Sequence, residues 1–240
     1  PPQHEGRYAE RPLRLPCFMG YEKAPPWPEL APPPALTRGY PTFGYFGRAI
    51  KMSPQTLSLW ADILRRMPEA RMIFKSGDYQ DAVLVTQVTS TLAALGVNPA
   101  HLEFRTGTSR FDHIAAYNDI DVSLDPFPHA GGVTTIESLL MGVPTITLLG
   151  DYICGRTGAS YLTLLGFKSA IARTPFEYAE HAISTASEVW TLEDRQAMRF
   201  RLLTSVLLSD DGYATAVEDA YRTIWREWCQ DRTRAEVAPL

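Results

Sequence analysis

Between residues 42 and 187 the chain changes repeatedly between two kinds of periodicity, and this alternation restricts the fold more than any other feature. Six short apolar segments lack the clean alternation of half-exposed strands and are typical of strands buried on both faces. They span residues 42–46, 71–75, 102–105, 120–125, 144–149 and 169–172. Helical spacing fills the intervals, at 54–67, 79–95, 109–118, 132–142, 156–165 and 175–187. The pattern predicts an α/β fold, a Rossmann-like parallel sheet with helices on both faces.

The two ends of the chain differ from this middle part. Seven prolines between Pro25 and Pro41 favour a stiff, extended backbone that packs on the lobe. Residues 192–230 predict two further helices, the second with an apolar stripe formed by Tyr221, Ile224, Trp225 and Trp228. The predicted domains are a connector over 1–40, a single lobe over 41–230 and a tail over 231–240.

Composition excludes several classes of partner. The net charge is -4, so no basic field favours nucleic acid. No apolar run approaches membrane-spanning length, so we expect no membrane partner. The cysteines, Cys17, Cys154 and Cys229, are scattered and fit neither a disulfide framework nor a zinc site. These observations predict a protein of a reducing compartment, the cytoplasm.

One strand-to-helix connection has residues suited to an anion. An apolar strand ends at Asp125, and Gly131 and Gly132 then allow the backbone to approach a ligand closely. The next helix begins with three residues that offer amides and, in two cases, hydroxyls: Val133, Thr134 and Thr135. Free amides and the helix dipole attract anions, and Glu137 can accept from ribose hydroxyls one turn further on. This order predicts a nucleotide diphosphate site, although ordinary strand-to-helix turns also favour glycine and threonine.

Three blocks in this chain resemble the O-linked N-acetylglucosamine transferase family, which includes SPINDLY-type plant proteins and bacterial members. They are FGYFGRAIKMSPQTLSLWADILRRMPEARMIFKS, FDHIAAYNDIDVSLD and DPFPHAGGVTTIESLLMGVPTITLLGDYICGRTGASYL, and the similarity runs from about Glu10 to about Trp228. The resemblance implies the C-terminal catalytic lobe of an inverting GT-B glycosyltransferase. The implied donor is UDP-N-acetylglucosamine, and the implied acceptor is a Ser or Thr hydroxyl of a protein. The family's N-terminal lobe and tetratricopeptide repeats would be partners that this chain does not contain.

The resemblance also implies roles for single residues. Lys51 matches a catalytic lysine that reaches the donor phosphates, where an ammonium favours the charge that develops on departing UDP. His113 matches a histidine that stacks on uracil, and Arg110 a basic residue near the same base. Arg156 matches an arginine beside the donor pocket. Because an arginine is poorly placed at a helix N-terminus, we expect a carboxylate or phosphate partner for it.

The diphosphate segment has its own matches in the family. Gly132, Val133, Thr134 and Thr135 match the helix start that cradles the diphosphate, and Glu137 matches an acidic position that contacts the ribose. Gly132 stands where animal relatives have a histidine. Arg48 stands where many relatives have a glutamine that contacts the donor phosphate or sugar. Because of both departures, the resemblance does not determine which sugar the donor carries. Two alternatives remain: a UDP-glucose-dependent protein N-glucosyltransferase lobe, and a degenerate, non-catalytic interaction module.

Two further features need an interpretation. Asp119 and Asp121 form an Asp-x-Asp sequence, the metal-binding mark of another glycosyltransferase fold, but they lie at the start of a strand, at the edge opposite the glycine loop. We therefore predict no metal and no cofactor.

His129 is the one side chain of the glycine loop able to shuttle a proton near neutral pH, and the resemblance does not support it as a general base.

Overall fold

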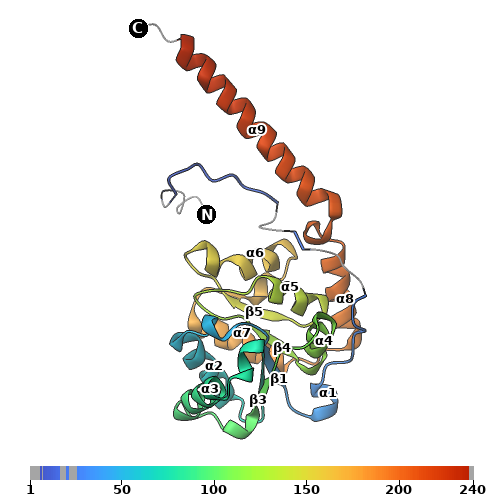
Figure 1. Cartoon of the computed structure of the whole chain (residues 1–240). Helices are drawn as coiled ribbons and strands as arrows, with labels where there is room; N and C mark the ends of the chain where they lie inside the picture. The colour runs from blue at the N-terminus through green and yellow to red at the C-terminus, as the bar shows by residue number, and fades with distance from the viewer. Residues whose placement is uncertain (1–5, 7, 17–19, 22–25, 238–240) are drawn as a thin grey trace. The chain divides into compact units, whose positions relative to one another are not determined.

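The structure is a computed structural model that describes residues 6, 8–16, 20–21 and 26–237 (Figure 1). Its contacts divide the chain into two compact units, Ala24–Ser205 and, taken together, Pro1–Lys23 with Val206–Leu240. Parts of the predicted connector, Cys17 and the end of the predicted tail lie outside the described residues. The domain boundaries drawn from the sequence remain predictions.

The larger unit is built on a six-stranded sheet in which all neighbouring strands are parallel. Its strands are β1 (Thr42–Tyr45), β2 (Arg71–Lys75), β3 (Leu102–Arg105), β4 (Val122–Leu124), β5 (Thr145–Leu148) and β6 (Ile171–Ala172). Their order is β3-β2-β1-β4-β5-β6, with Phe43 of β1 opposite both Met72 and Val122. The predicted Rossmann-like α/β fold is confirmed, and all six predicted strands are present, four of them shorter than predicted.

The strand order reverses at β1 and β4, and this reversal positions the site. The chain leaves β1 towards β2 and β3 on one side and continues through β4, β5 and β6 on the other. Connections that leave the carboxyl ends of β1 and β4 therefore diverge, which leaves a crevice where such sheets bind ligands. The glycine loop begins there, directly after Leu124.

The helices alternate with the strands as predicted. They are α1 (Ala35–Arg38), α2 (Pro54–Arg66), α3 (Ala82–Ala94), α4 (Arg110–Ala115), α5 (Val133–Leu140), α6 (Thr157–Leu164), α7 (Pro175–Ser187), α8 (Leu192–Leu203) and α9 (Asp210–Val237). Short 3₁₀ turns span Ala49–Lys51, Gly77–Gln80, Pro99–His101, Ala116–Asp119, Ile153–Gly155, Lys168–Ala170 and Val206–Leu208. The helix predicted over 79–95 is divided, because the Asp81 carboxylate accepts from the Val83 N–H and begins α3 anew.

Helices cover both faces of the sheet (Figure 1). On one face Ile146 of β5 joins a buried apolar cluster that includes Trp60 of α2 and Tyr178 of α7. On the other face Thr147 of β5 lies directly beneath Gly158 of α6, and α5 packs against α8. Neighbouring residues of β5 thus point to different helix layers, as strand geometry requires.

The described residues 26–40 belong to the same unit as the sheet. The Ala31 N–H donates to Asn118 Oδ1 at 3.0 Å, and Arg199 Nη2 donates to the Pro28 carbonyl at 2.9 Å. These contacts tie a proline-rich segment to the lobe through its backbone groups, which an extended chain leaves available.

The smaller unit contains the long helix α9. The Tyr21 N–H donates to the Leu207 carbonyl at 3.0 Å, so the two parts of this unit are joined by backbone. The predicted apolar stripe of α9 is present and exposed: Tyr221, Ile224, Trp225 and Trp228. The Trp225 and Trp228 rings stack with their centroids 5.1 Å apart. Within the described residues, every helix is too short or too polar to traverse a lipid bilayer.

Candidate functional site

The start of α5 has no side-chain cap, a feature that it shares with α1 and α6 of the same lobe. Its N-cap is Gly132, and among the described residues no side chain caps its first turn. Five other helices begin with a side chain that accepts from their first turn: Ser53 for α2, Asp81 for α3, Ser109 for α4, Thr174 for α7 and Thr191 for α8. The first amides of a helix need acceptors from outside the helix. The diphosphate segment predicted from the sequence is therefore a helix start to which the described residues supply no side-chain cap.

A buried aspartate holds the loop that leads to this helix. Asp125 Oδ1 accepts from the Gly131 N–H at 2.5 Å, and Oδ2 accepts from the Thr147 hydroxyl at 2.7 Å. The Tyr178 hydroxyl donates to the Asp125 carbonyl at 2.9 Å. Burial raises the pKa of the Asp125 carboxyl to about 6, although these hydrogen bonds and Lys51 favour its ionised form.

The two glycines of the loop have different surroundings. A Cβ on Gly131 would lie 2.5 Å from both Asp125 Oδ1 and Thr135 Oγ1, so no side chain fits there. A Cβ on Gly132 would meet nothing nearer than Thr157 Cγ2 at 3.9 Å. Gly131 is thus required by packing, whereas Gly132 leaves open space in front of the helix. Thr135 Oγ1 is buried and has no hydrogen-bond partner among the described residues.

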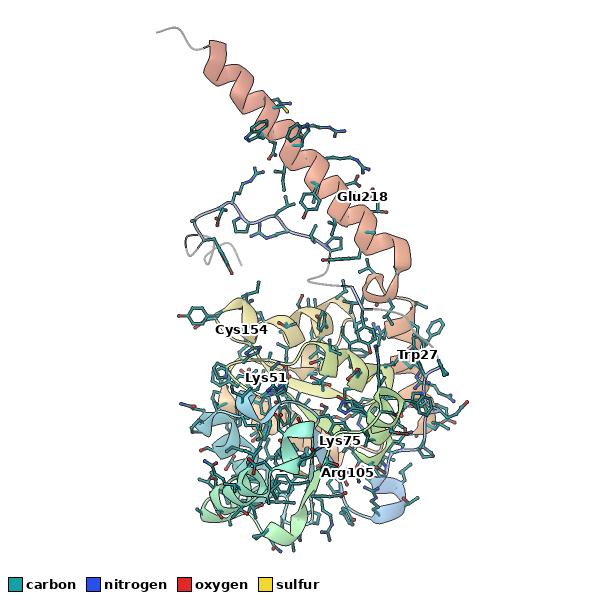
Figure 2. The ribbon with its side chains drawn as sticks, viewed as in Figure 1. Trp27, Lys51, Lys75, Arg105, Cys154 and Glu218 are labelled. Atoms are coloured by element: carbon teal, nitrogen blue, oxygen red, sulfur yellow. The ribbon has the colours of Figure 1, made fainter. Side chains whose placement is uncertain are left out.

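Lys51 lies against the same loop (Figure 2). It ends the 3₁₀ turn after β1, and its Nζ donates to the Ala130 carbonyl at 3.1 Å. The Ser53 and Thr56 hydroxyls both donate to the Phe127 carbonyl, each at 2.5 Å. The start of α2 therefore fixes the loop, and Lys51 is carried to its side. Burial, and secondarily the nearby Lys51 charge, lowers the pKa of His129.

A second loop, between β5 and α6, packs on the first. The Ala130 N–H donates to the Cys154 carbonyl at 2.9 Å, which joins the two loops. Arg156 is the N-cap of α6, and its Nη1 donates to the Gly150 carbonyl at 2.7 Å. The partner expected from the sequence was a carboxylate or phosphate; the partner in the structure is a backbone carbonyl of its own loop. Arg156 accordingly closes the loop between β5 and α6.

His113 and Glu137 meet beside the start of α5. His113 Nε2 lies 3.7 Å from Glu137 Oε2, and the Glu137 side chain is almost fully buried. The His113 ring packs edge-on against Phe46, with ring centroids 5.8 Å apart. Burial, and secondarily the charge of Lys75, lowers the pKa of His113. The two residues to which the resemblance assigns uracil and ribose are thus neighbours.

The two remaining basic residues are at the periphery. The Arg48 side chain is 74% exposed, and its Nε lies 3.8 Å from Asp78 Oδ2. Arg110 begins α4 and is exposed. The structure therefore brings together Lys51, Gly131, Gly132, Val133, Thr134, Thr135, Glu137, His113 and Arg156, and it leaves Arg48 and Arg110 on the outside.

Lys75 was missed by the sequence analysis. It is the last residue of β2, is 3% exposed, and its Nζ donates to the Thr106 carbonyl at 3.0 Å (Figure 2). Burial lowers its pKa, and the charge of Arg105 adds to the effect. A lysine that directly follows the apolar residues Met72, Ile73 and Phe74 at the ligand-binding edge was the signal that could have identified it.

The Asp-x-Asp sequence has partners within the protein. Asp121 accepts from the Ala35 N–H at 3.0 Å and from the Thr42 N–H at 2.8 Å. Asp119 pairs with the guanidinium groups of Arg38 and Arg105. Asp121 thus fastens the edge of the sheet opposite the glycine loop, whereas Asp119 pairs with Arg38 before β1 and with Arg105 at the end of β3. In the part of the chain that the structure describes, no three His, Cys, Asp or Glu side chains are grouped as a metal site.

Comparisons with known sequences find a matching family model and several relatives of this chain. A model described as glycosyl transferase family 41 matches residues 39–217. A rice (Oryza sativa subsp. japonica) protein described as a probable UDP-N-acetylglucosamine–peptide N-acetylglucosaminyltransferase SPINDLY is 34% identical over 232 residues, which are 95% of this chain and 25% of the rice protein. The Caenorhabditis elegans UDP-N-acetylglucosamine–peptide N-acetylglucosaminyltransferase is 25% identical over 187 residues, 78% of this chain and 16% of its own. The chain spans about a quarter of the length of the SPINDLY relatives.

Comparisons with solved structures agree. A mutant O-GlcNAc transferase from Thermobaculum terrenum superposes with a TM-score of 0.87 at 37% identity, covering 97% of this chain and 44% of that one. A sucrose-phosphate synthase from Thermosynechococcus elongatus matches with a TM-score of 0.55 at 15% identity, over 78% of this chain and 46% of its own. The second likeness concerns the fold alone.

Proposed function

The chain belongs to glycosyl transferase family 41, and from this premise we propose that its lobe binds UDP-N-acetylglucosamine for transfer to Ser or Thr hydroxyls of proteins. The glycosyltransferase class follows from the family, and the fold is that of a GT-B lobe. The donor, the acceptor and the inverting course of the reaction are the proposal.

The observation that carries the proposal is the uncapped start of α5 with Lys51 beside it. A Cβ on Gly132, the N-cap residue, would meet only Thr157 Cγ2, at 3.9 Å, and Lys51 Nζ is bonded to the adjacent Ala130 carbonyl. A diphosphate supplies the acceptors that such amides need, and a lysine adds a positive charge. Glu137 and His113, 3.7 Å apart, would then meet ribose and uracil on the far side of the diphosphate.

The transfer reaction explains why amides and a lysine are needed at this position. In an inverting transfer the acceptor oxygen forms a bond to the anomeric carbon while the bond from that carbon to the diphosphate oxygen breaks. The acceptor loses its proton, and UDP leaves with the bonding electrons and an added negative charge. Amides and an ammonium that are already in position stabilise this charge without reorganisation. Lys51 and the residues Gly132 to Thr135 would therefore act on the leaving group.

The length of the chain limits what this lobe does by itself. Because it spans about a quarter of its SPINDLY relatives, we propose that acceptor binding and the general base depend on the N-terminal lobe and the repeats of the family. The 240-residue chain would bind UDP and transfer sugar poorly or not at all.

Calorimetric titration with UDP tests the proposal. Lys51→Ala should weaken UDP binding by about 1–3 kcal/mol, the usual effect of removing a charge-assisted contact. Lys168→Ala is the matched control, because Lys168 is exposed and precedes β6 at the opposite edge of the sheet. Unchanged affinity in Lys51→Ala would remove Lys51 from the site. Absence of UDP binding by the wild type would favour the non-catalytic interaction module.

The sugar is tested separately. UDP-N-acetylglucosamine should protect the chain from thermal unfolding more than UDP-glucose at equal concentration, because a ligand that binds more tightly stabilises the folded state more. Stronger protection by UDP-glucose would favour the N-glucosyltransferase alternative and would leave the UDP site intact.

A further inference from the structure

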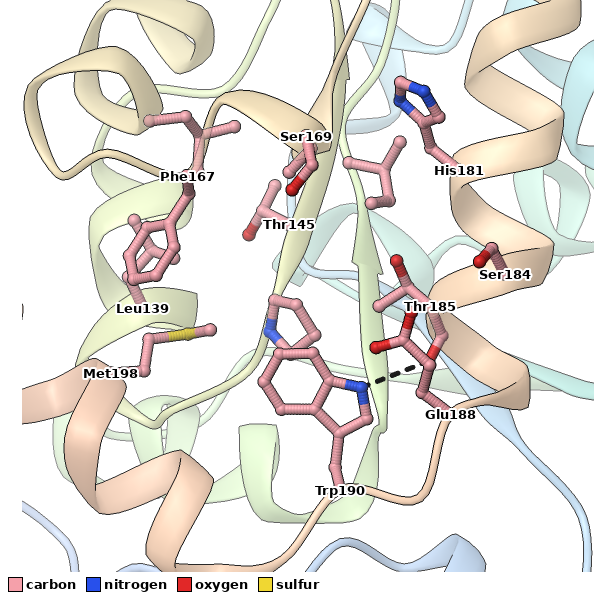
Figure 3. A pocket seen from close by; sticks show the side chains of 14 residues that line it. Leu139, Thr145, Phe167, Ser169, His181, Ser184, Thr185, Glu188, Trp190 and Met198 are labelled. Atoms are coloured by element: carbon pink, nitrogen blue, oxygen red, sulfur yellow. Dashed lines mark hydrogen bonds between the residues drawn. The ribbon is translucent and has the colours of Figure 1, made fainter.

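A cavity of about 230 Å³ lies at the amino-terminal edge of β5, away from the glycine loop (Figure 3). It exists because β6 is short. β6 pairs only with Thr147 and Leu148, so Thr145 and Ile146 begin β5 without a strand on that side. α7, the turn before β6, the middle of α8 and the C-terminal parts of α5 and α6 surround the resulting gap.

Two buried polar atoms of this cavity have no hydrogen-bond partner among the described residues. The first is Oγ1 of Thr145, whose residue is 1% exposed. The second is Nδ1 of His181, on α7, which covers the face of the sheet opposite to the Thr145 side chain. Thr147, two residues further along the same strand face, has its hydroxyl bonded to Asp125. Buried polar atoms without partners are rare in folded proteins, so the Thr145 hydroxyl points to a ligand with a hydrogen-bonding group.

The walls of the cavity suit an aromatic ring. Leu139, Phe167 and Met198 supply apolar surface, and in Figure 3 they lie on the side towards which the Thr145 hydroxyl is turned. The Trp190 Nε1–H is already donated to the Thr185 carbonyl at 3.2 Å, so this indole offers its ring surface. A cavity of roughly 150 Å³ is sufficient for benzene, and the larger volume here has room for a ring with substituents.

The charge at the cavity is negative. Glu188 lines it and is the C-cap of α7, where the helix dipole is also negative. The described lining residues include no lysine or arginine. A cationic substituent on the ligand would therefore be favoured, while a phosphate or carboxylate would be repelled.

We propose that this cavity is a second ligand site of the lobe, specific for a small aromatic amine that also carries a hydroxyl. The ring lies among Leu139, Phe167 and Met198, the hydroxyl bonds Thr145, and the ammonium group faces Glu188. This site is independent of the donor site, from which it is separated by the length of β5.

Tyramine is the probe, with two comparison compounds that each lack one group. Phenethylamine has no hydroxyl, and 4-ethylphenol has no ammonium group. Binding is followed in the ¹⁵N-labelled 240-residue chain through the Trp190 indole N–H resonance, which is assigned with Trp190→Phe. Tyramine should shift this resonance saturably and bind about fivefold or more tightly than phenethylamine, as one additional hydrogen bond predicts.

Two variants separate the contacts. Thr145→Val, similar in shape, should weaken tyramine about fivefold and leave phenethylamine unchanged. Glu188→Gln, at an exposed position, should weaken both amines by roughly two- to fivefold and leave 4-ethylphenol unchanged. Lys51→Ala, at the other edge of the sheet, should not change tyramine binding.

Circular dichroism and the melting temperature establish that each variant is folded. Absence of a saturable Trp190 shift with tyramine would overturn the proposal. Equal weakening of all three compounds by Thr145→Val would overturn it as well, because the hydroxyl would then have no specific partner. Neither result bears on UDP binding, so the proposed function is tested apart from this inference.

Discussion

The two ends of β4 use the same residue type for opposite purposes. Before the strand, Asp121 accepts from the Ala35 and Thr42 N–H groups and fastens the segment that precedes β1. After the strand, Asp125 accepts from the Gly131 N–H and the Thr147 hydroxyl. Burial raises the pKa of both carboxyls. The two ends differ because the first is closed by the protein's own groups, whereas the second leads to an uncapped helix.

This comparison indicates how a helix start becomes available to a ligand. At the starts of α2, α7 and α8 the side chain of the N-cap residue accepts from the first turn of the helix. Here Asp125, Ser53 and Thr56 hold the loop by its backbone. The first amides of α5 have no side-chain cap because the N-cap residue is Gly132, and the fixed loop keeps this glycine at the helix start.

The largest expected effect concerns the protonation of Asp125. Its pKa is raised from 3.8 to about 6, so between these pH values the folded state binds more protons than the unfolded state. The protonated Asp125 carboxyl therefore adds to the free energy of unfolding. This contribution is complete below pH 3.8 and is lost as the pH rises through 6, so the free energy of unfolding falls by about 3 kcal/mol. Asp125→Asn stays neutral and should not show this loss. Urea unfolding of both proteins at several pH values between about 4 and 7 measures the difference.

The other end of β4 provides the control for this experiment. Asp121 is also buried, but two amides and the charges of Arg195 and Arg38 counteract its pKa increase. Asp121→Asn should therefore alter the pH dependence less than Asp125→Asn. Parallel pH profiles for the wild type and Asp125→Asn would show that Asp125 is not responsible.

The next effect separates the two glycines of the loop. Gly131→Ala places a Cβ 2.5 Å from Asp125 Oδ1 and Thr135 Oγ1, and such overpacking costs about 1–3 kcal/mol of the free energy of unfolding. Because the loop must shift, UDP affinity should fall as well. Gly132→Ala, whose Cβ has 3.9 Å of clearance, is the control and should keep most of the stability. Equal losses in both variants would contradict the assignment of Gly131 to packing.

A smaller effect tests the uncapped helix directly. Gly132→Asp and Gly132→Asn both supply an N-cap acceptor to α5, so both should compete with UDP for the amides. The aspartate also repels the diphosphate, and we expect it to bind UDP at least about tenfold more weakly than the asparagine variant, or about 1.4 kcal/mol. The two side chains have nearly the same size, so calorimetry with UDP isolates the charge. UDP affinity unchanged in both variants would place the diphosphate elsewhere.

The sheet and the loop could be predicted from the sequence because their signals are local. Short segments without clean alternation of apolar and polar residues, separated by helical segments, indicate parallel strands. Two glycines followed by threonines mark a helix start where the backbone is accessible. The family resemblance added Lys51 and His113, and the structure brings Lys51 to the loop and His113 beside Glu137.

The residues that support the site could not be predicted in this way, because their partners are far away in the sequence. Thr56 holds Phe127, 71 residues further on, and Tyr178 holds Asp125 across 53 residues. Arg195 lies in a helix of polar composition but is 1% exposed, and its Nη2 donates to the Ile120 carbonyl at 2.6 Å. Periodicity describes which face of an element is buried and contains no information on such pairings.

The smallest effect is expected at the closed end of β4. Asp119 is partly exposed and pairs with Arg38 and Arg105, and exposed pairs contribute about 0–1 kcal/mol. Asp119→Asn should therefore change the free energy of unfolding only slightly and leave UDP affinity unchanged, with or without EDTA. A loss of UDP affinity in Asp119→Asn, matched by a similar loss when EDTA is added to the wild type, would mean that the Asp-x-Asp sequence holds a metal. Both ends of β4 would then serve the donor, and the distinction between a fastening edge and a binding edge would fail.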